Sequence, residues 1–227
     1  MATHLEIELD RLRRKLLRLG AAVEEGLHDA LRAFARREGQ LAARVIDDDV
    51  QVDRLEVDLE EDCLKVLALY QPVARDLRLI VAVLKINNDL ERVGDLAVNI
   101  AERVVSLCGR PPLGSPYDVV GMGEQSRAML RKSLDAFVNL DAGLAHEVCR
   151  MDDTIDAMNR EAYPKIVDAM KEQPGALEAL INYISISRNL ERVADHSTNI
   201  AENVIALLEG EIVRHRLEDF DRSAEEK

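Results

Sequence analysis

The chain has 227 residues and a formal net charge of −13, and aromatic residues make up only 3% of it, with no tryptophan. This acidic balance argues against nucleic acid as a partner, because phosphate backbones are bound by clustered lysine and arginine. No segment approaches the ~20 uncharged apolar residues of a membrane span, and the charged start of the chain lacks the apolar region of a signal peptide. We expect a cytoplasmic protein with an aliphatic core, which suits helix packing.

The three cysteines do not indicate a metal or disulfide framework. Cys63, Cys108 and Cys149 are odd in number, far apart, and match neither a CxxC motif nor a zinc-ligand spacing. We interpret them as reduced packing residues.

Apolar residues recur every three or four positions along six segments, which is the period of amphipathic helices. Gly39 is the expected end of the first helix, and Gly210 the expected end of the last. The dipeptides Gln71-Pro72 and Gln173-Pro174 separate the second helix from the third and the fifth from the sixth, since proline disfavours helix in the residue before it. The predicted helices span about residues 5–36, 41–70, 75–107, 119–139, 142–172 and 176–208.

A single Pro/Gly/Ser-rich segment, GRPPLGSPYD, divides the chain after the third helix. Three long helices joined by short loops form an up-down-up bundle. The sequence therefore predicts an all-α fold of two tandem antiparallel three-helix bundles. The first bundle covers residues 1–109, a linker covers 110–117, the second bundle covers 118–211, and an acidic tail covers 212–227.

The last predicted helix of each half carries the same surface. DLERVGDLAVNIAE at residues 89–102 and NLERVADHSTNIAE at 189–202 are identical at nine of fourteen positions. At 100° per residue, Glu91, Asp95 and Asn99 lie on one face, with the apolar residues on the opposite side. Carboxylates four residues apart repel each other. Both halves retain both acids, which favours binding of something cationic, with simple solvation of an outward face as the alternative.

The preceding helix of each half places two more acids at the same level. Asp49 and Asp95 lie equally far from the turn at Pro72, and so do Asp53 and Glu91. In the second half the same relation holds about the turn at Gln173-Pro174. Each antiparallel helix pair is thus expected to bring four carboxylates together, from Asp49, Asp53, Glu91 and Asp95 in the first half and from Asp152, Asp156, Glu191 and Asp195 in the second.

Four carboxylates on two helices form an oxygen-rich site for hard cations. Iron or zinc are the first candidates, and manganese, magnesium and calcium stay open. Asn99 and Asn199 could add a carbonyl oxygen or hold a water molecule. His196 lies about 100° off the acidic stripe, which favours a packing or supporting role over ligation.

The duplicated motifs resemble the PhoU family of phosphate-signalling regulators. The resemblance rests on QPVARDLRLIVAVLKINNDLERVGDLAVNIAE and ISISRNLERVADHSTNIAENV, and the duplicated length covers essentially the whole chain. It implies two three-helix bundles, surface metal clusters at the eight acids, and a homodimer. It also implies a negative regulator of phosphate uptake and of the phosphate-starvation response. The implied partners are the Pst phosphate transporter, through its ATPase subunit, and the PhoR sensor kinase, and the protein would reach the membrane only through them.

Two alternatives stay open. A di-metal carboxylate oxidase would need Glu-x-x-His pairs pointing into a bundle core, and no such pair occurs on the striped helices, so no enzymatic activity is expected. A metal-free acidic adaptor would bind basic partner surfaces directly, with salt-sensitive affinity. One departure from the repeat is the ARDLR stretch containing Arg75 and Arg78, which has no counterpart after Pro174. If these arginines contact a partner, the halves are not equivalent; otherwise they are solvated.

Overall fold

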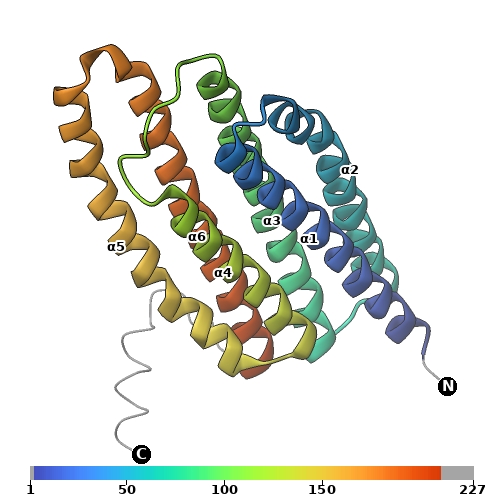
Figure 1. Cartoon of the computed structure of the whole chain (residues 1–227). Helices are drawn as coiled ribbons and strands as arrows, with labels where there is room; N and C mark the ends of the chain where they lie inside the picture. Colours follow the sequence, from blue (N-terminus) through green and yellow to red (C-terminus); the bar gives the residue numbers. More distant parts are fainter. Residues whose placement is uncertain (1–2, 211–227) are drawn as a thin grey trace, which may run out of the picture.

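The computed structural model describes residues 3–210, and this part of the chain contains six long α-helices and no β-strand (Figure 1). The predicted all-α fold is confirmed. The predicted acidic tail and residue 211 lie outside the described residues. The six helices are α1 His4–Arg36, α2 Gly39–Tyr70, α3 Ala74–Cys108, α4 Val119–Asn139, α5 Ala142–Glu172 and α6 Leu177–Glu209, with a short 3₁₀ turn at Pro174–Ala176 before α6.

Local chemistry accounts for both ends of α1 and for the end of α6. Thr3 and Glu6 form a reciprocal capping box at the start of α1, which satisfies backbone N–H groups that no helix carbonyl can reach. Gly210 has a φ of 79° and ends α6, as predicted. The predicted stop at Gly39 is wrong. The left-handed residue that ends α1 is Arg37, with a φ of 55°, and Gly39 is already the first residue of α2.

The side chain of Arg37 also forms hydrogen bonds with the backbone where α3 passes into the linker. Its guanidinium donates hydrogen bonds to the backbone oxygens of Leu107 at 2.6 Å and Arg110 at 2.8 Å. Leu107 lies in the last turn of α3 and Arg110 just after it, where carbonyls no longer have an N–H partner four residues further along a helix. The turn between α1 and α2 therefore fixes the start of the linker.

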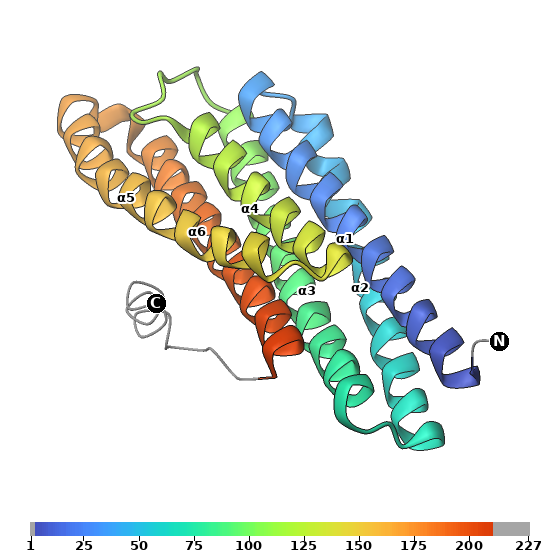
Figure 2. The same cartoon turned by 90° about the horizontal axis from the view of Figure 1, so that it is seen from below.

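The halves meet through α3 against α6 and α1 against α4, whereas α2 and α5 each contact only their own half. The two central helices run antiparallel: Asn182 of α6 donates to Ser106 near the end of α3 at 3.2 Å, and His196 contacts Asp89 nearer the start of α3. Figure 2 shows α3 and α6 side by side between the other helices. The core is aliphatic, as the composition predicts.

The contact between α1 and α4 is reciprocal. Leu134 of α4 packs on Gly20 of α1, and Leu31 of α1 packs on Gly123 of α4. A Cβ atom at Gly20 would lie 2.9 Å from Leu134, and one at Gly123 would lie 2.4 Å from Leu31. The duplication has thus produced an approximate two-fold relation, in which a glycine of each half receives a leucine of the other.

Substituting Gly123 with valine should destabilise the protein by about 1–3 kcal/mol, the usual cost of overpacking a well-filled interior. Denaturant unfolding measures this change. Gly26→Val is the matched control, because nothing lies within 4 Å of a Cβ atom at Gly26 on α1. Equal stability of the two variants would contradict the close α1–α4 contact.

Candidate metal centre

In the first half, two acids of α2 and two of α3 lie within electrostatic range of one another. The pKa of Asp49 rises from 3.8 to about 6, first because the carboxyl is half-buried and then because Asp53, Asp95 and Glu91 repel its charge. Burial and the nearby Asp95 also raise the pKa of Glu91. We call these four residues the first acid quartet. Each carboxyl group that ionises in the quartet raises the free-energy cost of ionising the next one.

The equivalent residues of α5 and α6 form the second acid quartet. Burial raises the pKa of Asp152 to about 6, with further contributions from Asp195, Asp156, Asp153 and Glu191. Burial and the charge of Asp156 raise the pKa of Asp195, whereas His196 and Arg192 oppose that rise. The Oδ1 atom of Asp152 is buried and has no hydrogen-bond partner in the described part of the chain. A bound cation would satisfy this oxygen.

Few positive charges balance the quartets. Arg92 contacts Glu91 at 3.4 Å and Asp95 at 3.6 Å, and Arg160 contacts Asp156 at 3.4 Å. Within residues 3–210, no group of three or more His, Cys, Asp and Glu side chains has the arrangement of a formed metal site. The chemistry fits a hard cation, since every donor is a carboxylate oxygen and one of them is an orphan. A metal would have to draw the carboxylates closer together.

Glu56 of α2 extends the first acid quartet and was not among the residues predicted from the sequence. Burial raises its pKa, followed by the charges of Glu60, Glu91 and Asp53, while a 2.8 Å hydrogen bond from Asn87 opposes the rise. Glu56 lies three residues after Asp53, which is the helical spacing that could have found it. The equivalent position in the second half is Asn159, which accepts a 2.7 Å bond from Ser187. At this position only the first half has an additional carboxylate.

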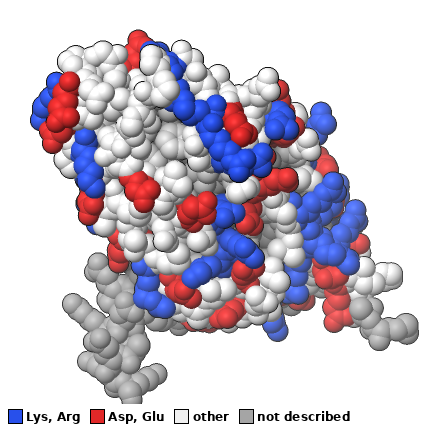
Figure 3. All heavy atoms as spheres, viewed as in Figure 1, with Lys and Arg blue, Asp and Glu red and all other residues white. Residues whose placement is uncertain are grey.

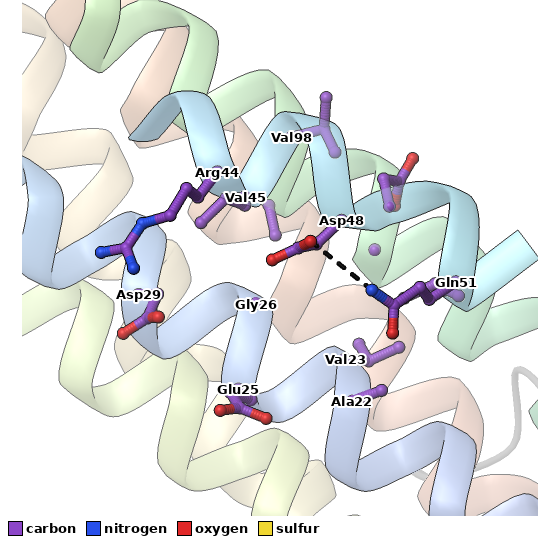
Figure 4. Close-up of a pocket in the computed structure, with 14 residues that line it drawn as sticks. Ala22, Val23, Glu25, Gly26, Asp29, Arg44, Val45, Asp48, Gln51 and Val98 are labelled. Carbon is purple, nitrogen blue, oxygen red and sulfur yellow. Dashed lines mark hydrogen bonds between the residues drawn. The ribbon is translucent and has the colours of Figure 1, made fainter. Parts of the chain in front are cut away.

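A cavity of about 200 Å³ lies between α1 and α2 behind the first quartet, and Asp49 and Gly94 both line it. Figure 4 shows Glu25 and Asp29 of α1 facing Asp48 and Gln51 of α2 across this space. A Cβ atom at Gly94 would lie 3.1 Å from Val52 and 3.4 Å from Oδ1 of Asp49. Glycine there allows α2 to bring Asp49 against α3.

His196 does not lie on the acidic stripe. Its Nδ1 is 3.0 Å from Oδ1 of the buried Asp89, and since a carboxylate only accepts, the imidazole N–H donates. Asn199 also donates to this oxygen, at 3.5 Å. His196 and Asn199 of α6 thus bind a carboxylate of α3, across the junction of the halves.

Asp89 is the only buried carboxylate among the described residues. A core di-metal oxidase needs several inward-pointing carboxylates and histidines, and the aliphatic core of residues 3–210 offers no such set. On the face shown in Figure 3, acidic and basic side chains are intermixed. No described helix is long and apolar enough to span a membrane.

Both halves of the chain match the same known protein domain. Residues 16–104 and 119–204 each match the PhoU domain. The chain belongs to the PhoU family. It is 41% identical over 210 residues to the phosphate-specific transport system accessory protein PhoU homolog of Pseudomonas putida, covering 92% of this chain and 82% of that protein. A homolog of the same description from Aquifex aeolicus is 37% identical, over 92% of this chain and 95% of its own length.

Solved structures agree with the fold. The crystal structure of PhoU from Pseudomonas aeruginosa superposes with a TM-score of 0.88 at 39% identity, covering 90% of this chain and 99% of that one. The phosphate transport system regulatory protein PhoU from Streptococcus pneumoniae gives a TM-score of 0.86 at 31% identity, covering 92% and 99%. The predicted pair of three-helix bundles is therefore confirmed.

Proposed function

We propose that this PhoU family member is an accessory regulator of phosphate transport, which represses phosphate uptake and the phosphate-starvation response when phosphate is plentiful. The observation that carries the proposal is similarity at about 40% identity over nearly the full length to proteins described as phosphate-specific transport system accessory proteins. Its partners would be the ATPase subunit of the Pst transporter and the PhoR sensor kinase. The protein would act in the cytoplasm, as a homodimer and without catalysing a reaction.

The regulatory role can be tested in a bacterium that lacks its own PhoU and carries a reporter of the starvation response. Expression of this chain should restore repression in phosphate-rich medium and leave induction in phosphate-poor medium intact. A reporter that stays fully active in rich medium, with the protein present in normal amount, would refute the proposal.

We further propose that the two acid quartets hold metal ions, with iron or zinc as the first candidates. Asp49, Asp53, Glu91 and Asp95 would bind one ion or cluster, and the second quartet would bind the other. The crowding of like charges, the raised pKa values and the orphan oxygen of Asp152 support this assignment. The metal would neutralise each quartet and join the two helices that supply it.

Replacing Asp95 and Asp195 together with asparagine should remove most of the bound metal and leave the fold intact, because both side chains lie at the surface. Elemental analysis of protein purified without chelator measures the metal content, and helical circular dichroism confirms the fold. Unchanged metal content in the double variant would rule out these ligands.

A metal-free acidic adaptor is the second candidate, because no formed metal arrangement occurs in residues 3–210. In that case both the wild type and the double variant would be purified without metal. Binding to the transporter ATPase would then weaken with added salt and would not respond to a chelator.

A further inference from the structure

Three arginines gather in a hollow of about 530 Å³ at one end of the molecule. The starts of α1 and α3 and the ends of α4 and α6 meet at this end, which is the lower end in Figure 1. Arg13 comes from α1, and Arg75 and Arg78 come from α3. The floor of the hollow includes the buried apolar side chains of Leu9, Leu79 and Leu207.

None of the three arginines forms an ion pair with a residue in the described range. Three acids also line the hollow, and two of them have other partners. Glu6 accepts the backbone N–H of Thr3 at 2.6 Å, and Asp10 pairs with Arg14 at 3.1 Å. Asp76 lies in the first turn of α3, where a negative charge offsets the helix dipole. The guanidinium groups therefore keep their donors for a ligand.

The backbone at this end is also unusual. Ala74, the first residue of α3, has a φ of 48°, a left-handed conformation that is uncommon for a residue with a Cβ atom and that, unlike the three other described cases, does not follow a helix end. No side chain caps the start of α3, since its N-cap residue is Val73. The N–H groups of Asp76 and Leu77 bond the carbonyl of Val73, at 3.2 and 3.5 Å. The N–H groups of Ala74 and Arg75 are therefore the ones left without a helical acceptor at this end. Uncommon backbone conformations of this kind concentrate at ligand sites.

The second half lacks this arrangement. The positions equivalent to Arg13, Arg75 and Arg78 are Pro116, Gly175 and Glu178. Glu178 forms an ion pair with Arg110 of the linker. The bundle fold is therefore compatible with other residues at all three positions, and the arginines are not required to build it.

We propose that this hollow binds the dianionic phosphate group, either as inorganic phosphate or as a small phosphate monoester. Planar guanidinium groups donate paired hydrogen bonds to phosphate oxygens, and three of them line this one hollow. The start of α3 adds N–H donors and the positive end of a helix dipole. The site uses none of the quartet acids, so it would sense phosphate without bound metal.

Equilibrium dialysis of the full-length, chelator-treated protein against radiolabelled inorganic phosphate tests the proposal. The Arg13→Gln and Arg75→Gln double variant should bind phosphate about tenfold more weakly than wild type, because it loses two charged donors. Asp76→Asn should bind more tightly, since it removes a negative charge from the hollow. Arg127→Gln is the matched control, because Arg127 pairs with Glu124 on α4 outside the hollow, and its binding should equal that of wild type.

Parallel dialysis with glycerol 3-phosphate separates the two sources of the ligand. If only inorganic phosphate binds, the ligand is the free ion. If both probes bind and the variants affect both in the same way, phosphate monoesters are ligands as well. Either result supports the site. Absence of binding to wild type, or equal binding by all variants, overturns it. Because dialysis involves no partner protein, a negative result leaves the regulatory role to be decided by the reporter strain.

Discussion

Replacing Asp49 and Asp152 with asparagine is expected to stabilise the metal-free protein at pH 7 and to abolish its stabilisation by metal. Both carboxyl groups have a pKa of about 6 in the folded chain, whereas the unfolded value is near 3.8. The folded state therefore retains these protons to higher pH than the unfolded state does. Its relative stability is greatest below about pH 4 and falls as pH rises through about 6.

At pH 7 each aspartate is charged inside its quartet, at a cost that asparagine avoids. We expect a gain of about 1 kcal/mol per site in the free energy of unfolding, after discounting the pKa shifts for solvent screening at these half-exposed groups. Metal at a concentration of about 100 times its dissociation constant should stabilise the wild type by about 2.7 kcal/mol. The double variant should gain almost nothing from the same metal.

Urea unfolding with and without metal, repeated at pH 5 and pH 7.5, measures both effects. The stability gap between the metal-free variant and wild type should narrow to roughly half at pH 5, and it should close only below about pH 4, where Asp49 and Asp152 are protonated in the unfolded chain as well. Metal stabilisation of the wild type should also weaken at pH 5, because protons compete for the carboxylates. Asp10→Asn on α1 is the control, since Asp10 pairs with Arg14 outside the quartets. A variant that metal stabilises as strongly as wild type would exclude Asp49 and Asp152 as ligands.

The helices and the acid quartets follow from the sequence, because both depend on local geometry. Apolar periodicity and the Gln-Pro turns predict the helix spans to within two residues. The constant rise of an α-helix then sets which residues of an antiparallel pair lie at the same level. This reasoning predicts that Asp49 lies near enough to Asp95 to feel its charge, as the raised pKa of Asp49 indicates.

The packing between the halves could not be predicted in this way. Periodicity shows that α3 and α6 each have an apolar face, but it does not show that these faces meet or in which register. The pair of Asp89 and His196 is therefore visible only in the structure. The position of Arg37 was also missed, because a non-glycine residue with positive φ leaves no composition signal. Whether the quartets bind metal stays a prediction.

His196→Leu is expected to destabilise the protein by about 2–3 kcal/mol, because it leaves the buried Asp89 with only the longer bond from Asn199. The internal repeat suggests a second substitution that should offset this loss of stability. The positions equivalent to Asp89 and His196 are Asn189 and Leu96, so the repeat has asparagine and leucine at the positions that carry aspartate and histidine here. The double variant Asp89→Asn with His196→Leu should therefore recover to within about 1 kcal/mol of wild type.

A double-mutant cycle, measured by urea unfolding of the metal-free protein, separates the interaction free energy of Asp89 and His196 from their interactions with other residues. The two single changes and the double change together give the coupling energy, which should be favourable by about 1–2 kcal/mol. If the double variant is as unstable as His196→Leu alone, the asymmetry has another origin, and the hydrogen bond is not what fixes the register of α3 on α6. Recovery would mean that asparagine and leucine can replace the aspartate and histidine pair at the junction of α3 and α6.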